Sequence, residues 1–211
     1  MGDKKQALIL VDIQKDFMPD GPLPTAGGYE VVPVANRLIP QFEIVAATQD
    51  WHPPDHVSFA SNHEGKQPHD VIDAPRGLKQ ELWPDHCIRE SEGAEFVEGL
   101  DIERIDRVFR KGTDPEIDSY SGFFDNGHEK KTGLGDWLKE REVTDVYLVG
   151  VATDVCVKFT ALDARQLGFE TYVVEDGTRG VEGRPGDIAR ALDEMRRAGC
   201  RIVRSEQVRA A

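Results

Sequence analysis

Cys156 is the residue of this chain whose type and position best suit covalent chemistry. Residues 146–151 (VYLVGV) are short, apolar and β-branched, as expected of a parallel strand covered on both faces. From Cys156 the apolar spacing becomes helical and continues to Gly168. A thiol in a first helical turn lies among unpaired backbone N–H groups, which favour the thiolate and can receive an oxyanion. The sequence therefore predicts a nucleophile, with a buried structural cysteine as the alternative.

Charged side chains close two other predicted strands, at 7–11 (ALILV) and 105–110 (IDRVFR). Asp12 follows the first strand and Lys111 follows the second. Reacting groups in open α/β sheets collect at the carboxyl ends of the strands, so both side chains are expected near Cys156. Asp12 would then take the thiol proton as a general base, and the charge of Lys111 would keep Asp12 ionised. Taken alone, each residue is explained as well by a turn cap, a salt bridge or a solvated side chain.

A carboxylate and two imidazoles form a second candidate set. Asp50 and His52 follow the predicted strand 43–48 and, being separated by one residue, point to the same face of an extended chain. His86, in the segment LWPDHC, supplies the second imidazole. Such a mixed set of nitrogen and oxygen ligands suits zinc, iron or manganese. Four other residues are alternative ligands: His56, His63, His69 and Cys87. The three histidines are more readily explained as loop or surface residues, and Cys87 as a buried residue with no role in the site.

The elements that must position these side chains alternate between strand-like and helix-like patterns. The predicted strands are 7–11, 43–48, 105–110, 146–151, 170–174 and 201–204, and the predicted helices are 29–41, 133–142, 155–167 and 186–198. This order predicts a three-layer α/β fold, with a doubly wound, mostly parallel six-stranded sheet and helices on both faces. We expect one domain over residues 1–211, with an irregular insertion at about 50–104 whose length suggests a functional role.

The composition argues against several classes of protein. The 39 acidic and 26 basic residues give a net charge of −13, which disfavours nucleic acid or an anionic membrane as a partner. No stretch is long enough for a membrane span, and the first residues lack the features of a signal peptide. The three cysteines, Cys87, Cys156 and Cys200, do not make a disulfide framework. A reducing, cytoplasmic setting is therefore expected, and homo-oligomerisation is left open.

Five segments resemble the nicotinamidases of the isochorismatase-like cysteine hydrolases. They are LILVDIQKDF, ATQDWHPPDHVSFASNH, LWPDHC, RKGTDPEIDSYSGF and VGVATDVCVKFTALDA, and the likeness covers nearly the whole chain. Carried over position by position, the resemblance implies a catalytic triad and a metal site. Their residues are Asp12, Lys111 and Cys156 for the triad and Asp50, His52 and His86 for the metal.

The same resemblance implies the remaining parts of the site. A cis peptide is expected between Val151 and Ala152, with the backbone N–H groups of Ala152 and Cys156 forming an oxyanion hole. Aromatic side chains would enclose a nicotinamide pocket and line its mouth. These side chains, for which ordinary core packing is the alternative, are Phe17, Trp83 and Tyr120.

The reaction implied by the resemblance is hydrolysis of nicotinamide to nicotinate and ammonia, a step of NAD salvage, through a thioester on Cys156. One divalent metal ion, with zinc favoured and iron or manganese as alternatives, would orient the pyridine nitrogen rather than generate the nucleophile. Pyrazinamide is expected to fit the same pocket.

Three other functions remain open at the level of sequence. The nearest is a sister amidase or isochorismatase that acts on a different small substrate, although members without metal generally lack the Asp50, His52 and His86 set. A second is an enzyme in which metal-bound water attacks and Cys156 is a bystander. The third is a catalytically silent relative that binds a pyridine ligand or a protein partner, against which the intact Asp-Lys-Cys set argues.

Overall fold

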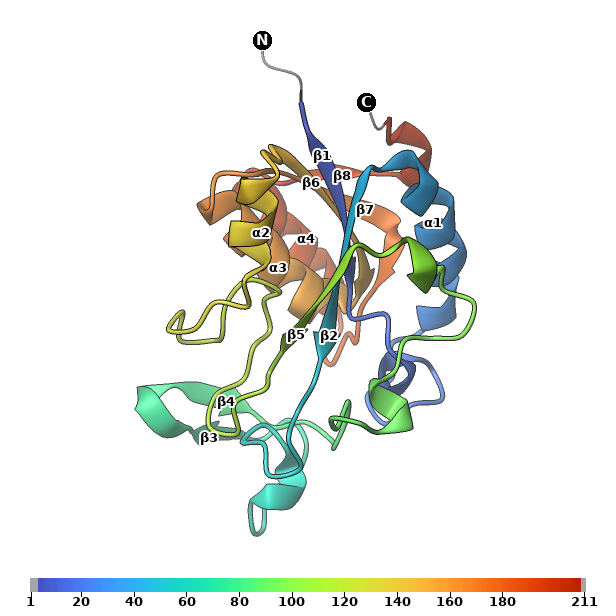
Figure 1. Cartoon of the computed structure of the whole chain (residues 1–211). Coiled ribbons are helices and arrows are strands. Elements are labelled where there is room, and N and C mark those ends of the chain that lie inside the picture. Colours follow the sequence, from blue (N-terminus) through green and yellow to red (C-terminus); the bar gives the residue numbers. More distant parts are fainter. Residues whose placement is uncertain (1–3, 210–211) are drawn as a thin grey trace.

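A six-stranded sheet forms the centre of the protein. The computed structural model describes residues 4–209, so residues 1–3 and 210–211 of the predicted domain lie outside the described residues. The strand order is β5-β2-β1-β6-β7-β8, and every neighbouring pair is parallel (Figure 1). The strands are β1 (Gln6–Val11), β2 (Ile44–Asp50), β5 (Arg107–Lys111), β6 (Asp145–Val151), β7 (Glu170–Arg179) and β8 (Arg201–Val203). The predicted doubly wound α/β fold is confirmed.

Helices cover both faces of this sheet, as Figure 1 shows. They are α1 (Val31–Leu38), α2 (Leu134–Glu140), α3 (Lys158–Gln166) and α4 (Asp187–Arg197). In β1, Leu8 and Leu10 pack in the cluster that contains α1, whereas Ile9 packs with the cluster of the other three helices. Burial on both faces explains why the central strands are continuous apolar runs rather than alternating ones.

Two predicted helices differ in detail from the observed ones. The segment 29–41 contains α1 flanked by short 3₁₀ turns, Gly28–Glu30 and Ile39–Gln41. The predicted helix 155–167 begins as a wide π turn, Thr153–Val157, because the carbonyl of Ala152 accepts the N–H of Val157 at 3.0 Å. No helix within residues 4–209 is long and apolar enough to cross a membrane.

The insertion after β2 extends past the carboxyl ends of the strands. It has little regular structure beyond a two-stranded antiparallel sheet of β3 (Val71–Asp73) and β4 (Lys79–Glu81), which lies below the end of β2 in Figure 1. Isolated bridges join Phe59 to Trp83 and His52 to Ile88. The insertion therefore carries its side chains to the same edge of the sheet as the strand ends.

The order of the strands places a crevice between β1 and β6. The chain passes from β1 to β2 on one side, and later from β5 to β6 on the other side of β1. Connections that leave neighbouring parallel strands in opposite directions open a crevice at their carboxyl ends, where ligands bind in α/β proteins. Asp12 directly follows β1 and Ala152 directly follows β6 at this point.

Candidate active site

Three predicted catalytic side chains, from the ends of three strands, meet in the crevice. The Nζ atom of Lys111, the last residue of β5, lies 2.9 Å from Oδ2 of Asp12 and 3.5 Å from Sγ of Cys156. All three residues are buried, with exposed fractions of 0% for Asp12, 2% for Lys111 and 6% for Cys156. The structure thus brings together an acid, an ammonium and a thiol that are far apart in the sequence.

The carboxylate of Asp12 is held by a threonine on the adjacent strand. The backbone at Asp12 has a positive φ of 47°, which turns the chain away at the end of β1. The Thr48 hydroxyl donates to Oδ1 of Asp12 at 2.6 Å and accepts the Asp12 N–H at 3.3 Å. Oδ2 is thereby left for Lys111 and the thiol.

Burial controls the charges of the triad. It raises the pKa of the Cys156 thiol well above its usual value, which favours the thiol over the thiolate. Loss of solvation thus opposes the thiolate expected from the helix terminus, whereas the charge of Lys111 favours it. Burial also raises the pKa of Asp12, although Lys111 opposes this shift. A carboxylate with a raised pKa is better suited to accept the thiol proton.

Lys111 keeps its charge despite being buried. Burial opposes the ammonium form, but the carboxylates of Asp12 and Asp50 raise the pKa of Lys111 well above its usual value. Its ammonium bonds the Asp50 carboxylate and donates to the Ser119 carbonyl at 2.9 Å. Lys111 thus links the triad to the predicted metal residues.

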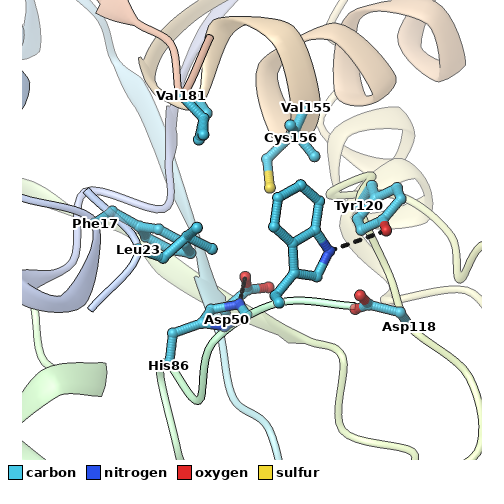
Figure 2. Close-up of a pocket in the computed structure, with 11 residues that line it drawn as sticks. Phe17, Leu23, Asp50, His86, Asp118, Tyr120, Val155, Cys156 and Val181 are labelled. Carbon is cyan, nitrogen blue, oxygen red and sulfur yellow. Dashed lines mark hydrogen bonds and ion pairs between the residues drawn. The ribbon is translucent and has the colours of Figure 1, made fainter. Parts of the chain in front are cut away.

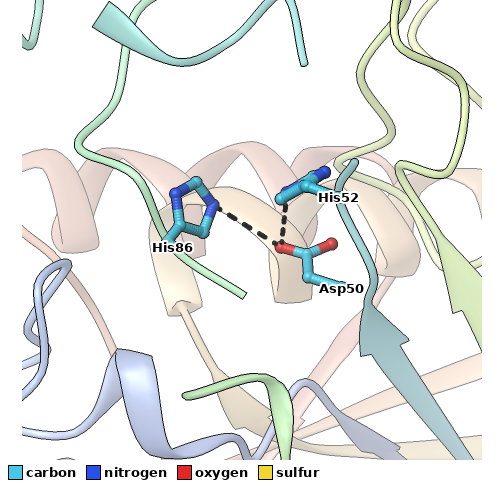
Figure 3. Close-up of side chains that lie close together, drawn as sticks. All are labelled: Asp50, His52 and His86. Atoms are coloured by element: carbon cyan, nitrogen blue, oxygen red, sulfur yellow. Dashed lines mark ion pairs between the residues drawn. The ribbon is translucent and has the colours of Figure 1, made fainter. Parts of the chain in front are cut away.

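The three predicted metal ligands also meet (Figure 3). Their ligand atoms lie within 4.8 Å of one another. Oδ2 of Asp50 is 3.5 Å from Nε2 of His52 and 3.9 Å from Nε2 of His86. Nδ1 of His52 donates to the Gly112 carbonyl at 2.9 Å, and Nδ1 of His86 donates to the Pro84 carbonyl at 2.7 Å. Since a carbonyl only accepts, these bonds place each ring proton on Nδ1 and turn the Nε2 lone pairs toward Asp50.

This donor set fits a divalent metal ion. Two nitrogen lone pairs that face a carboxylate oxygen repel it unless a cation lies between them, and Nε2 of His52 is buried without a hydrogen-bond partner. Burial lowers the pKa of His86 to about 4, which keeps its imidazole neutral and able to ligate. For His52, Asp50 outweighs burial and raises the pKa, so a proton and a metal compete for its Nε2.

The four residues considered as alternative metal ligands differ in their positions relative to the site. His56 lies in a loop, as predicted, but it is fully buried rather than on the surface. Its ring centroid lies 4.2 Å from that of His52, and its Nε2 has no hydrogen-bond partner. His56, His52 and Asp118 form a second group of potential ligand atoms.

The other alternative ligands lie outside this group. His63 bonds the Val57 carbonyl, and His69 pairs with Glu81 on the surface. Among residues 4–209, Cys87 is buried and belongs to none of the potential metal groups.

A small pocket separates the thiol from the metal residues (Figure 2). It encloses about 360 Å³ of free space, including its mouth. The three aromatic residues implied by the resemblance all line it, and the indole N–H of Trp83 donates to the hydroxyl of Tyr120 at 3.2 Å. The complete lining is Phe17, Leu23, Asp50, Trp83, His86, Asp118, Tyr120, Ala152, Val155, Cys156 and Val181.

Sequence reasoning missed several of these residues. Asp118 lies in the segment RKGTDPEIDSYSGF and Val155 directly precedes Cys156, so proximity to the quoted motifs was a usable signal. Leu23 and Val181 are apolar residues in irregular segments, and nothing in their local sequence distinguishes them from core residues.

The turn that presents Cys156 has the backbone that the resemblance implies. The peptide between Val151 and Ala152 is cis. The Ala152 carbonyl accepts the N–H groups of Val155 and Val157 at 3.1 and 3.0 Å. These bonds hold the turn in place so that Cys156 faces the pocket, as Figure 2 shows.

Comparison with known proteins assigns this arrangement to a family. Residues 6–207 match the model of the isochorismatase domain, and this match covers nearly the whole chain. The chain belongs to the isochorismatase family. Within that family it is 49% identical to the nicotinamidase of Escherichia coli K12, over 93% of each protein.

Solved isochorismatase-like structures share the fold. A nicotinamidase and pyrazinamidase of Acinetobacter baumannii superposes with a TM-score of 0.92 at 43% identity, covering 98% of this chain and 99% of that one. The pyrazinamidase of Pyrococcus horikoshii, solved in complex with zinc, gives a TM-score of 0.77 at 38% identity and covers 95% and 99%. The predicted membership of the isochorismatase-like hydrolases is confirmed.

Proposed function

We propose that this isochorismatase-family chain is a nicotinamidase, which hydrolyses nicotinamide to nicotinate and ammonia. The observation that carries the proposal is that one small pocket has the Asp12, Lys111 and Cys156 group on one side and a metal-ligand set on the other. An amide attached to a pyridine ring can present its carbonyl carbon to the thiol and its ring nitrogen to the metal set. Likeness to nicotinamidases along nearly the whole chain supports this substrate.

The metal set defines one end of the pocket. Asp50, His52 and His86 would hold a divalent ion, which supplies a Lewis acid that orients the pyridine nitrogen. We favour zinc, with iron or manganese as alternatives, because the ligands are a carboxylate and two imidazoles and a related pyrazinamidase was solved with zinc.

Acylation begins with transfer of the Cys156 proton to Asp12. The thiolate attacks the carboxamide carbon, and the charge that develops on the oxygen is stabilised by the backbone N–H groups of Ala152 and Cys156. Lys111 stabilises the negative charge shared by the thiolate and Asp12 while the proton moves. Asp12 then gives its proton to the leaving nitrogen, ammonia departs, and a thioester remains on Cys156.

Deacylation reverses the roles at the same residues. Asp12 takes a proton from a water molecule, which attacks the thioester carbon and releases nicotinic acid, and this acid loses its proton to solvent to become nicotinate. The thiolate of Cys156 leaves and recovers the proton from Asp12, so the resting thiol is restored. Phe17 and Trp83, both less than one-tenth exposed, would form apolar walls that hold the ring and limit access of bulk water.

The wider setting follows from the same proposal. Pyrazinamide, which has the same amide on a similar ring, is expected to react in this pocket. All three cysteines are free and buried, which supports a reducing compartment, and we place the enzyme in the cytoplasm in NAD salvage.

The test is release of ammonia from nicotinamide by the purified protein, measured before chelation, after chelation and after metal is restored. We expect fast release that chelation abolishes and metal add-back recovers. A metal-loaded protein that releases no ammonia from nicotinamide but cleaves another small amide would instead identify a sister amidase.

A further inference from the structure

Asp50 is the last residue of β2 and lies beyond the point where β1 stops pairing with that strand. β1 pairs with β2 only as far as Leu10 and Ala47, because the chain turns away at Asp12, whereas β2 continues to Asp50. On the other side β5 still pairs with the end of β2, where Asp50 lies opposite Lys111. The backbone of Asp50 that faces the β1 side therefore has no strand to bond, and buried peptide groups need partners.

The side chain of Gln14 takes the place of the missing strand. Its Nε2 donates to the Asp50 carbonyl at 2.9 Å, and its Oε1 accepts the Asp50 N–H at 2.8 Å. A carboxamide is the side-chain group that offers a donor and an acceptor in one plane, as a peptide does. The second N–H of Gln14 donates to the Ala94 carbonyl at 2.9 Å, and Gln14 is 0% exposed. Both N–H groups and the oxygen of the Gln14 amide are therefore hydrogen-bonded.

These bonds fix a residue on which two functions depend. The Asp50 carboxylate bonds the Lys111 ammonium and faces the Nε2 atoms of His52 and His86. A small rotation of the Asp50 backbone would move its carboxylate away from the two imidazoles. When a residue that hydrogen-bonds a metal ligand and holds it in place is replaced, metal affinity typically falls by about 10- to 100-fold.

We propose that Gln14 is a positioning residue that holds Asp50 in the geometry needed to bind the metal ion. The inference rests on the metal site of the proposed function and extends it to a residue that is itself neither a member of the metal set nor a pocket-lining residue. Gln14 acts through the backbone of Asp50 and takes no part in the chemical steps.

The chain offers a matched control in Gln49. This second glutamine is also buried, at 7% exposure, and its Nε2 donates at 2.9 Å to the same Ala94 carbonyl that Gln14 bonds. Its Oε1 accepts from Arg110, and no side-chain bond joins it to Asp50 within the described residues. Gln49→Met therefore removes a buried amide of the same kind without freeing Asp50.

The experiment uses full-length protein from which metal has been removed (stripped protein), without substrate. Its zinc dissociation constant is measured by competition with a chromophoric chelator. We expect Gln14→Met to weaken zinc binding by about 10- to 100-fold, and Gln49→Met to leave it unchanged. Gln14→Glu keeps the acceptor for the Asp50 N–H and replaces Gln14→Met where that variant does not fold; it too is expected to bind zinc more weakly. Thermal melting of the stripped variants separates loss of affinity from loss of fold.

Wild-type affinity in a folded Gln14 variant, equal losses in the Gln14 and Gln49 variants, or no zinc binding by the wild type would overturn the inference. Failure of the proposed function has a different signature. A wild type that binds zinc but does not cleave nicotinamide would reject the substrate, while the difference between the two glutamine variants would still support the role of Gln14.

Discussion

The Lys111 side chain contacts both the catalytic group and the metal set. Its ammonium lies against Asp12 and Asp50 and within 3.5 Å of the Cys156 sulfur. A buried cation between two buried carboxylates leaves one negative charge in excess. A proton would neutralise that charge, and a divalent metal ion would turn it into one positive charge. Thiol chemistry and metal binding are therefore electrostatically coupled through one residue.

Lys111→Met is expected to destabilise the fold as well as stop the reaction. It removes the charge that compensates two buried carboxylates, and breaking a buried ion pair in this way typically costs about 3–5 kcal/mol. Denaturant unfolding of the stripped proteins measures the effect. As control, Lys130→Met breaks an exposed ion pair with Asp114 and is expected to cost at most about 1 kcal/mol. Equal stabilities for the two variants would contradict the role given to Lys111.

The site residues differ in how far the sequence could reveal them. Asp12, Lys111 and Cys156 could be proposed because each ends or follows a recognisable strand, and parallel strands end at a common edge. Thr48 and Gln14 could not, because their partners are set by the register of β1 against β2 and by where β1 stops. The upward pKa shift of Cys156 could not be predicted either, since it depends on burial that a local pattern does not specify.

At the scale of elements, the close approach of β1 and β6 shapes the crevice. Gly150 lies opposite Val11 in the parallel pairing and has a φ of +126°. A Cβ atom at Gly150 would lie 2.0 Å from the Val11 carbonyl oxygen, which is far inside contact distance. A glycine at this position therefore lets the two strands meet just before Asp12 and Cys156.

Gly150→Ala is expected to lower the free energy of unfolding by about 3 kcal/mol or more, because backbone strain adds to a clash with backbone atoms. Gly168→Ala is the matched control: its φ is +93°, but a Cβ there meets nothing within 4 Å. That variant is expected to lose only about 1 kcal/mol. Denaturant unfolding compares the two, and a Gly150→Ala protein as stable as Gly168→Ala would show that the strands adjust freely.

Elements were predicted better than their ends. The apolar runs located all six strands of the main sheet, but β2 extends to Asp50 and β7 to Arg179, beyond the predicted limits. The start of the helix after Cys156 was misjudged because the Ala152 carbonyl accepts from Val157, and no local spacing encodes that wider turn. Terminal hydrogen bonds of this kind are chosen by the surrounding structure.

At the scale of the whole molecule, the alternating order of elements was enough to predict a doubly wound sheet and the edge that carries the site. The path of the insertion was not predictable. It is fixed by contacts distant in sequence, such as the bond from the Cys87 N–H to Asp16 and that from Gln14 to Ala94, which carry His86 back to Asp50. Its length, its irregular composition and the candidate ligands His52 and His86 indicated a role.

The net charge of −13 makes a prediction at the same scale. Excess negative charge destabilises the compact state by self-repulsion, and salt at about 0.15 M screens charges beyond about 8 Å. The melting temperature of the stripped protein is therefore expected to rise when sodium chloride is raised from near zero to that level. A fall would indicate that attractive ion pairs dominate, and sucrose at equal osmolality controls for effects other than screening.

The central claim is that Cys156 cleaves nicotinamide in a pocket that also binds metal, and one comparison tests it most directly. Ammonia release from nicotinamide is measured for metal-loaded wild type and Cys156→Ala, with the metal content of both determined. We predict rapid release by the wild type and none by Cys156→Ala at equal metal content. Release by Cys156→Ala at the wild-type rate would contradict the account, because water activated at the metal would then be the nucleophile.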